Sequence, residues 1–300
     1  MQRFITLVAA ATLVTGLAAC GSSSKPAAST TSTTAASSGD LFSKLPAAIQ
    51  ASKKINVGSD IEYPPIEFFK EGTTTVDGLD YDLAQALGAK LGVTFKFIDD
   101  TDFAGIIGAM QAGRFDIIMS AMNDTAERRA KGADFVDYFT AGTSIIVAHG
   151  NPKNIQKLED LCGTTVAVQK GTVQDTDLIT PQVAKCTTAS KPLNVLRFEK
   201  DTDALQQVKN GRAVANLEDF PVAAYNAKTS GGGNDFTAVD VPGIGPGNYG
   251  IAVLKTNTQL RDALQSALKE VIADGTYDQI LTKWGVTAGA LKTAPINAGS

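Results

Sequence analysis

Short apolar runs alternate with amphipathic segments along most of the chain. Lys54–Ser59 and residues 93–98 and 164–169 are apolar runs bounded by polar residues, as in buried strands. Residues 76–92 and 102–112 instead place apolar residues at helical spacing. Because strands and helices alternate, we expect an α/β fold whose sheets are largely parallel.

The alternation continues in the second half of the chain. A turn at residues 170–174 opens a helix there, and strand, helix and strand follow at residues 193–198, 202–210 and 213–217. The expected strands end in polar residues. In an open α/β sheet, ligands bind beyond the carboxyl ends of the strands, so this pattern indicates a binding site.

The stretch from Phe115 to Arg129 shows the pattern most clearly. A short apolar run leads into a polar loop with Ser120, Asn123 and Asp124, and a capped turn then opens a short helix. Arg128 in this turn offers a planar fork of donors that suits a carboxylate. The alternative is a solvated surface arginine.

The first forty residues differ from the rest. Residues 1–19 have a basic start and an apolar stretch too short to span a bilayer, as in a signal peptide. They end in Leu-Ala-Ala directly before Cys20, the lipobox pattern, which predicts cleavage before Cys20 and lipidation of its thiol. An ordinary secretory signal is the alternative. Residues 20–40, rich in Ser, Thr and Ala, are expected to form a flexible linker.

Composition excludes several kinds of chemistry. The chain has 300 residues, a net charge of −4 and no basic stripe, so we expect no nucleic-acid partner. His149 is the only histidine, which excludes His-based triads and multi-His metal sites. No phosphate-binding or dinucleotide-binding motif is present, and we expect no metal and no cofactor.

Two cysteines remain if Cys20 is acylated. An exported chain with only Cys162 and Cys186 left allows a single pairing, so we predict a disulfide between them. Two buried free thiols are the alternative.

Five motifs, in this order, resemble those of one protein family, and Lys283-Trp284-Gly285 near the end also fits. The motifs are Asp60-x-x-Tyr63-Pro64-Pro65, Gly78-Leu79-Asp80-Tyr81-Asp82-Leu83-Ala84, Gly113-Arg114-Phe115-Asp116 through Thr125-Ala126-Glu127-Arg128, Val168-Gln169-Lys170-Gly171-Thr172, and Asp219-Phe220-Pro221-Val222-Ala223-Ala224-Tyr225. From about Ile55 to Trp284 the chain is similar to the family-3 extracellular solute-binding proteins of ABC importers, the polar amino-acid type.

The resemblance implies a type II periplasmic-binding-protein fold, with two lobes joined by a two-strand hinge. Residues 41–148 and 249–300 would form a discontinuous first lobe, and residues 149–248 the second. We then expect a monomeric lipoprotein, anchored through lipid on Cys20 to the extracytoplasmic face of the cell membrane. Its partners would be an amino acid and an ABC permease in the membrane.

The resemblance also implies roles for individual residues. Arg128 would bind the ligand carboxylate, helped by Thr172 and by backbone N–H groups near Asn123 and Val173. Asp219 would bind the ammonium group, with the Ala121 carbonyl. The expected ligand-binding set is Arg128, Asp219, Thr172, Asp60, Tyr63, Phe103, Ala121, Asn123, Val173 and Glu218.

The side-chain end of the pocket is expected to be acidic. Asp60, Glu62 and Glu218 are candidates there beside Tyr63 and Phe103, which favours basic amino acids and glutamine over glutamate and aspartate. Glu62, Glu67 and Glu218 could equally face solvent. The alternative function is an enzyme on the same fold, such as a cyclohexadienyl dehydratase relative, with Glu218 or Lys170 as the acid/base.

Overall fold

The computed structural model describes residues 38–239, 244–245 and 247–300. The predicted signal peptide, Cys20 and most of the predicted linker lie outside these residues. The described part begins with helix α1 (Ser38–Ser43), so the end of the predicted 20–40 linker is helical. Within the described ranges, no helix is long and apolar enough to cross a membrane.

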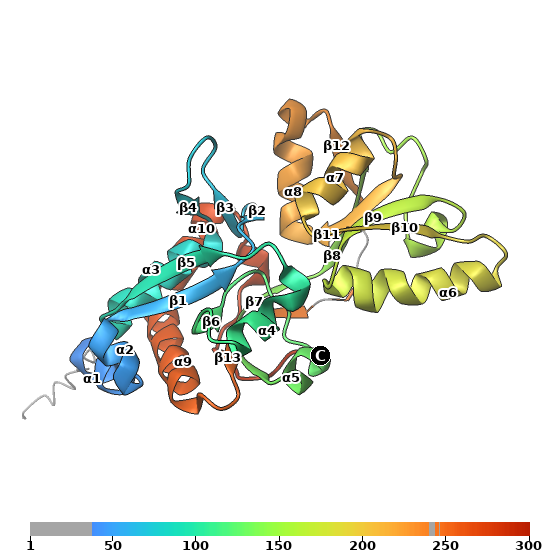
Figure 1. The fold of residues 1–300 in the computed structure, drawn as a ribbon. Coiled ribbons are helices and arrows are strands. Elements are labelled where there is room, and N and C mark those ends of the chain that lie inside the picture. Colours follow the sequence, from blue (N-terminus) through green and yellow to red (C-terminus); the bar gives the residue numbers. More distant parts are fainter. Residues whose placement is uncertain (1–37, 240–243, 246) are drawn as a thin grey trace, which may run out of the picture. The chain divides into compact units, whose positions relative to one another are not determined.

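The first lobe is built on a five-stranded sheet with the order β5-β1-β6-β13-β7 (Figure 1). Its strands are β1 (Lys54–Ser59), β5 (Thr94–Asp99), β6 (Ile117–Ile118), β7 (Ala133–Ala141) and β13 (Gly247–Leu254). β1 pairs in parallel with β5 and β6, whereas β13 is antiparallel to β6 and β7. β13, from the C-terminal part of the chain, therefore lies inside the sheet, between strands that come much earlier in the sequence.

The second lobe has its own five-stranded sheet with the order β10-β9-β11-β8-β12. Its strands are β8 (Thr143–Ala148), β9 (Thr165–Gln169), β10 (Asn194–Phe198), β11 (Ala215–Asp219) and β12 (Phe236–Val239). β9 is parallel to β10 and β11, and β8 is antiparallel to β11 and β12.

Two expectations from the sequence need correction. Both sheets are mixed rather than largely parallel, because β13 runs antiparallel to its neighbours in the first sheet and β8 runs antiparallel to its neighbours in the second. The chain also enters the second sheet at Gly142, before β8, and not near Ala148 as expected. β7 and β8 form one long apolar stretch, so hydrophobic periodicity could not locate the crossing.

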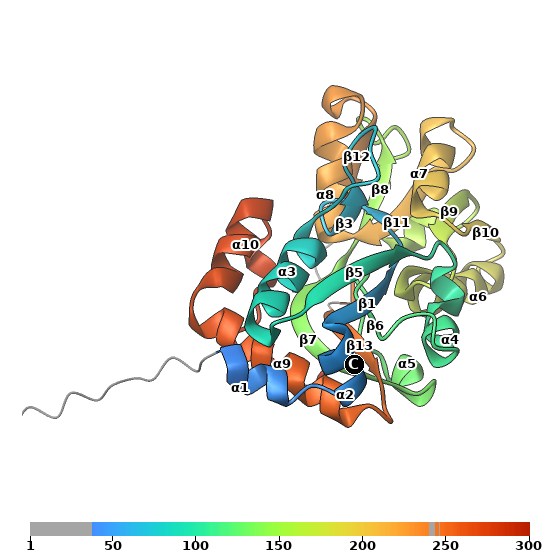
Figure 2. The ribbon, with the colours of Figure 1, turned by 60° about the vertical axis from the view of Figure 1, so that its left-hand side comes forward.

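Helices cover both faces of each sheet. In the first lobe, α1, α2 (Ala47–Ser52), α3 (Leu79–Leu91), α9 (Thr258–Ala273) and α10 (Thr276–Trp284) enclose one core with Ile55, Val57 and Ile251. A smaller core on the other face joins α4 (Ile106–Gln111) to Ile118 and Phe135, and α5 (Ala126–Ala130) packs beside β7 (Figure 2). Burial of these apolar side chains stabilises the sheet that presents the strand ends.

The second lobe is layered in the same way. α6 (Thr180–Thr188) and the π-helical turn before it, Gln174–Ile179, cover one face of the sheet. α7 (Asp201–Lys209) and α8 (Phe220–Thr229) cover the other face. A small third sheet of β2 (Glu62–Tyr63), β3 (Glu67–Phe69) and β4 (Val76–Asp77) follows β1, and β4 takes the first two residues of the range 76–92 that was expected to be helical.

The predicted disulfide is confirmed. Cys162 and Cys186 are joined, with 5.0 Å between their Cα atoms, and the bond ties α6 to the segment that precedes β9. By the chain-entropy model, closing a loop of this length contributes about 3 kcal/mol to stability.

Candidate functional site

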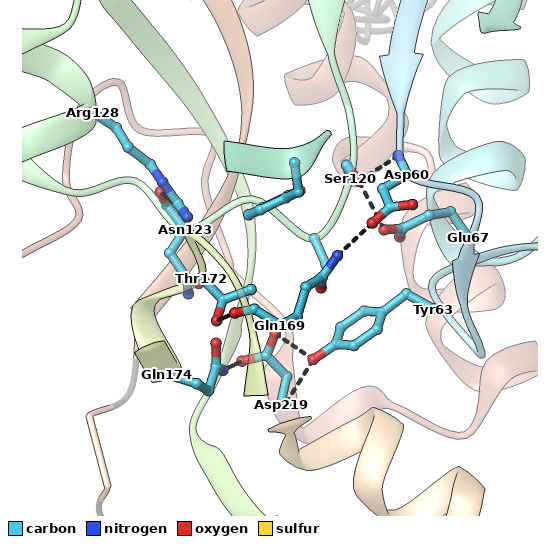
Figure 3. Close-up of a pocket in the computed structure, with 12 residues that line it drawn as sticks. Asp60, Tyr63, Glu67, Ser120, Asn123, Arg128, Gln169, Thr172, Gln174 and Asp219 are labelled. Carbon is cyan, nitrogen blue, oxygen red and sulfur yellow. Dashed lines mark hydrogen bonds between the residues drawn. The ribbon is translucent and has the colours of Figure 1, made fainter. Parts of the chain in front are cut away.

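A pocket lies where strand ends of the two lobes meet (Figure 3). Asp60 follows β1, Gln169 ends β9 and Asp219 ends β11, so the pocket has the position expected for a ligand site in α/β sheets. The residues that line it are Asp60, Tyr63, Glu67, Phe103, Ser120, Ala121, Asn123, Arg128, Gln169, Thr172, Gln174 and Asp219.

Arg128 supplies a buried cation on one side of the pocket. The hydroxyl of Thr125 caps α5 by accepting a hydrogen bond from the Arg128 N–H, which fixes the backbone of the arginine. Its Nη1 donates to the Asn123 carbonyl at 2.9 Å, and its Nη2 donates to the Gly171 carbonyl of the second lobe at 3.1 Å. Burial lowers the pKa of Arg128 to about 10, so the guanidinium stays charged at neutral pH.

The ring of Phe103 lies over this guanidinium. Arg128 Cζ is 5.3 Å from the ring centroid, which is cation–π distance. Phe103 thus supports the arginine from one side and leaves the remaining donors of the fork for a ligand.

Asp219 supplies a buried anion across the pocket from Arg128. One carboxylate oxygen accepts from Gln174 Nε2 at 2.9 Å, and the other accepts from the Tyr63 hydroxyl at 3.3 Å. The Tyr63 oxygen accepts in turn from the Asp219 N–H at 2.8 Å. Burial raises the pKa of Asp219 to about 6, and these hydrogen bonds keep it from rising further. At pH 7 the group is therefore mostly ionised.

Two more acids form the end of the pocket that faces away from Arg128 in Figure 3. Asp60 Oδ2 accepts from Gln169 Nε2 at 2.6 Å, and Glu67 Oε1 accepts from the Ser120 hydroxyl at 3.1 Å. The second oxygens, Asp60 Oδ1 and Glu67 Oε2, are buried and have no hydrogen-bond partner among the described residues. When these carboxyl groups are ionised, both oxygens are acceptors that need donors.

Burial dominates the acidity of these two groups. It raises the pKa of Asp60 to about 8, with a further rise from Glu62 nearby. Burial and repulsion from Asp80 raise the pKa of Glu67 well above its ordinary value. A positive charge placed against them would be stabilised by both groups, and it would lower the pKa of each.

The structure brings most of the predicted site residues together. Arg128, Asp219, Thr172, Asp60, Tyr63, Phe103, Ala121 and Asn123 all line the pocket. Phe103 contacts Arg128 and Tyr63 contacts Asp219, so these two rings support the charged groups as well as shaping the pocket.

Val173 and Glu218 are placed elsewhere. Val173 lines two neighbouring cavities, beyond Thr172. Glu218 is fully buried on the opposite face of β11 from Asp219, and it accepts hydrogen bonds from Asn216 and Asn226 at 3.0 Å. Adjacent strand residues point to opposite faces, so Glu218 and Asp219 cannot both face the pocket. The expectation for Glu218 is therefore corrected.

Sequence reasoning missed four residues of the lining: Glu67, Ser120, Gln169 and Gln174. Gln169 could have been predicted, because it is the last residue of β9 and ligands bind at the carboxyl ends of strands. Glu67 was not, because its burial depends on the small β2-β3-β4 sheet that the sequence did not predict.

The fold and pocket are those of a two-lobed binding protein. The family model for bacterial extracellular solute-binding proteins, family 3, matches residues 55–287. The chain belongs to this family.

Characterised relatives share most of the chain. The arginine-binding protein ArgT of Corynebacterium glutamicum is 32% identical over 259 residues, which cover 86% of this chain and 83% of the relative. A solved ancestral arginine-binding protein bound to arginine is 35% identical with a TM-score of 0.70, covering 77% of this chain and 98% of that one.

A third relative is connected to an enzyme. The ancestral amino acid-binding protein AncCDT-1, a precursor of cyclohexadienyl dehydratase, is 36% identical with a TM-score of 0.69. The alignment covers 79% of this chain and 97% of that protein. That precursor is itself an amino acid-binding protein.

Proposed function

We propose that this protein binds a basic α-amino acid, arginine first, between its two lobes. The observation that carries this proposal is the pair of buried, unpartnered oxygens on Asp60 and Glu67 at one end of the pocket. A guanidinium carries its charge permanently and has five donors, so it can satisfy both oxygens. The binding of arginine by two of the relatives supports the same ligand.

The other end of the pocket supports recognition of the amino-acid headgroup. Arg128 can pair with the α-carboxylate and Asp219 with the α-ammonium group, each already buried among partners that fix its position. In the proposal, the headgroup is also contacted by Thr172 and the Asn123 backbone at its carboxylate and by the Ala121 carbonyl at its ammonium group. Since both charges are desolvated before the ligand arrives, each gains most from a ligand with the opposite charge at the matching end.

We propose binding without turnover. The enzyme alternative needed Glu218 or Lys170 as an acid/base. Glu218 is not among the lining residues, and Lys170 is an exposed residue paired with Glu199 at 3.0 Å. Neither is in reach of a ligand held in the pocket.

We further propose that the protein is a lipid-anchored monomer that hands its ligand to an ABC permease. The family consists of extracellular solute-binding proteins, and the lipobox before Cys20 supplies the anchor in this proposal. One lipid anchor on a flexible tether would keep the binding protein near its permease.

Calorimetric titration with arginine, lysine, glutamine and glutamate tests the proposed ligand. We expect arginine to bind most tightly and glutamate least, because a ligand carboxylate would meet Asp60 and Glu67. Asp60 has a pKa of about 8 and is largely protonated at pH 7, so a bound guanidinium should displace its proton. Arginine binding at pH 7 should therefore release protons, which makes the measured enthalpy depend on the ionisation enthalpy of the buffer.

Glutamine provides the internal control, because it has the same headgroup and no side-chain charge. Its binding should release fewer protons than arginine binding does. Glutamate binding at least as tight as arginine binding would contradict the proposed specificity.

The anchor has its own test. The Cys20→Ala variant should appear in the soluble extracytoplasmic fraction, while the wild type partitions with the membrane, because no acyl chain can be attached to alanine. Cell fractionation followed by detergent phase partitioning measures this. Cys20→Ala protein that still partitions into detergent would rule out the lipobox interpretation.

A further inference from the structure

Glu62 connects the two lobes at a place outside the ligand pocket. It lies on β2 of the first lobe, and its three partners belong to the second lobe, at the start of α7. Oε1 accepts from the Asp201 N–H at 3.0 Å, and Oε2 accepts from the Thr202 hydroxyl at 2.9 Å. Lys200 Nζ lies 3.3 Å from Oε2.

The N-terminus of α7 has no side-chain cap of its own. Its N-cap residue is Lys200, whose side chain has no acceptor. The carboxylate of Asp201 at the first helical position is turned inward, where it accepts from Asn216 at 3.0 Å. Glu62 therefore supplies from the other lobe the acceptor that a Ser, Asp or Asn usually supplies at a helix start.

None of these residues lines the ligand pocket: Glu62, Lys200, Asp201 and Thr202 are all absent from its lining. The sequence left open whether Glu62 faces the pocket or solvent, and its side chain instead reaches across to α7. A contact of this kind changes how long the lobes stay together. The charge of Glu62, which also raises the pKa of Asp60, acts alike on ligand side chains of the same charge, such as those of arginine and lysine.

We propose that Glu62 is a closure latch: it caps α7 only when the lobes are together, and so sets the balance between the closed and open arrangements. The proposal rests on the binding function proposed above, and it adds that the two lobes separate and close again over the ligand. When the lobes separate, the Asp201 N–H and the Glu62 carboxylate return to water, and the cap and the ion pair with Lys200 are lost together.

Two consequences distinguish a latch from a ligand-binding residue. The apparent dissociation constant is the intrinsic constant divided by the fraction of protein that can adopt the binding-competent arrangement, so loss of the latch weakens the two cationic ligands, arginine and lysine, by the same factor. The weakening should appear mainly as faster dissociation, because the latch acts after the ligand has entered.

The test compares four variants with the wild type: Glu62→Ala, Thr202→Ala, the double variant, and Glu71→Ala. Glu71 is an exposed acid of the same lobe, so its variant is the matched control. Loss of a helix cap and its ion pair should raise the arginine dissociation constant about 2- to 30-fold in Glu62→Ala. Thr202→Ala should have a smaller effect, and the double variant should match Glu62→Ala, because both changes remove the same contact.

Two readouts separate the latch from a general loss of stability. The ratio of arginine to lysine affinity should stay unchanged in Glu62→Ala, whereas a variant of the pocket acids should alter it. Fluorescence energy transfer between one label in each lobe, measured without ligand, should shift toward longer distances in Glu62→Ala and remain unchanged in Glu71→Ala.

The outcomes are distinct for the two proposals. If the wild type binds none of the amino acids, the binding proposal fails, and the ligand-free energy-transfer measurement alone decides on the latch. If Glu62→Ala keeps both the wild-type distances and the wild-type dissociation rate, the latch is overturned. A changed arginine-to-lysine ratio would also overturn it, because Glu62 would then be acting on the ligand.

Discussion

Replacement of Arg128 by alanine is expected to weaken arginine binding by roughly 30- to 5,000-fold, the range for truncating one partner of a buried charge pair. The ligand carboxylate would enter the pocket without its cation, and the Asn123 and Gly171 carbonyls that now accept from Arg128 would be left unpaired. The arginine affinity of Arg128→Lys should lie between those of the wild type and Arg128→Ala, because lysine keeps the charge and loses the planar fork. Isothermal titration with arginine measures all three proteins.

Arg212→Ala is the matched control for this prediction. Arg212 is exposed, and its variant should bind arginine like the wild type. Thermal unfolding without ligand checks that the Arg128 variants are folded. Wild-type affinity in a folded Arg128→Ala protein would show that the headgroup lies elsewhere in the pocket.

Replacement of Asp219 by asparagine should weaken binding over the same range, about 2–5 kcal/mol for a buried charge pair. The shape of the side chain is kept and the charge is removed, so the ligand ammonium group would be buried without an anion. A pH series adds a second signature. Since the pKa of Asp219 is about 6, protonation below that pH removes the charge, and wild-type affinity should fall as the pH drops through 6.

Asp219→Asn should lack this step near pH 6. Proton release from Asp60 on arginine binding at pH 7 should remain in the variant, because Asp60, with a pKa of about 8, lies at the other end of the pocket. Asp203→Asn, an exposed acid on α7, is the control and should leave both the affinity and the pH profile unchanged. A step near pH 6 that persists in Asp219→Asn would assign the titration to another group.

Local sequence signals predicted the separate elements well. β1 begins and ends where the apolar run predicted, and the capped turn before Arg128 is present with Thr125 as the cap. These features depend on residues that are close together in the chain, so the local pattern of apolar and capping residues predicts them directly. The mixed sheets and the crossing at Gly142 depend on pairings between distant strands, about which the local pattern says nothing.

The site residues also divide into those that local signals predict and those that depend on distant parts of the chain. Arg128, in the capped turn that opens α5, and Asp219, at the end of β11, could be predicted because each belongs to a recognisable motif. Glu67 could not, since its burial comes from a sheet whose two-residue strands leave no periodic signal. Glu218 was assigned to the site because it neighbours Asp219, and strand alternation turns it to the opposite face.

The place of β13 inside the first sheet has a consequence for how the protein is made. The chain leaves the ribosome from its N-terminus, and by residue 239 every strand of the second sheet has been synthesised. At that point the first sheet still consists of two pieces, β5-β1-β6 and β7, with the place between β6 and β7 unfilled. The first lobe, although it begins the chain, can therefore be completed only after the second, when residues 247–254 join its two pieces.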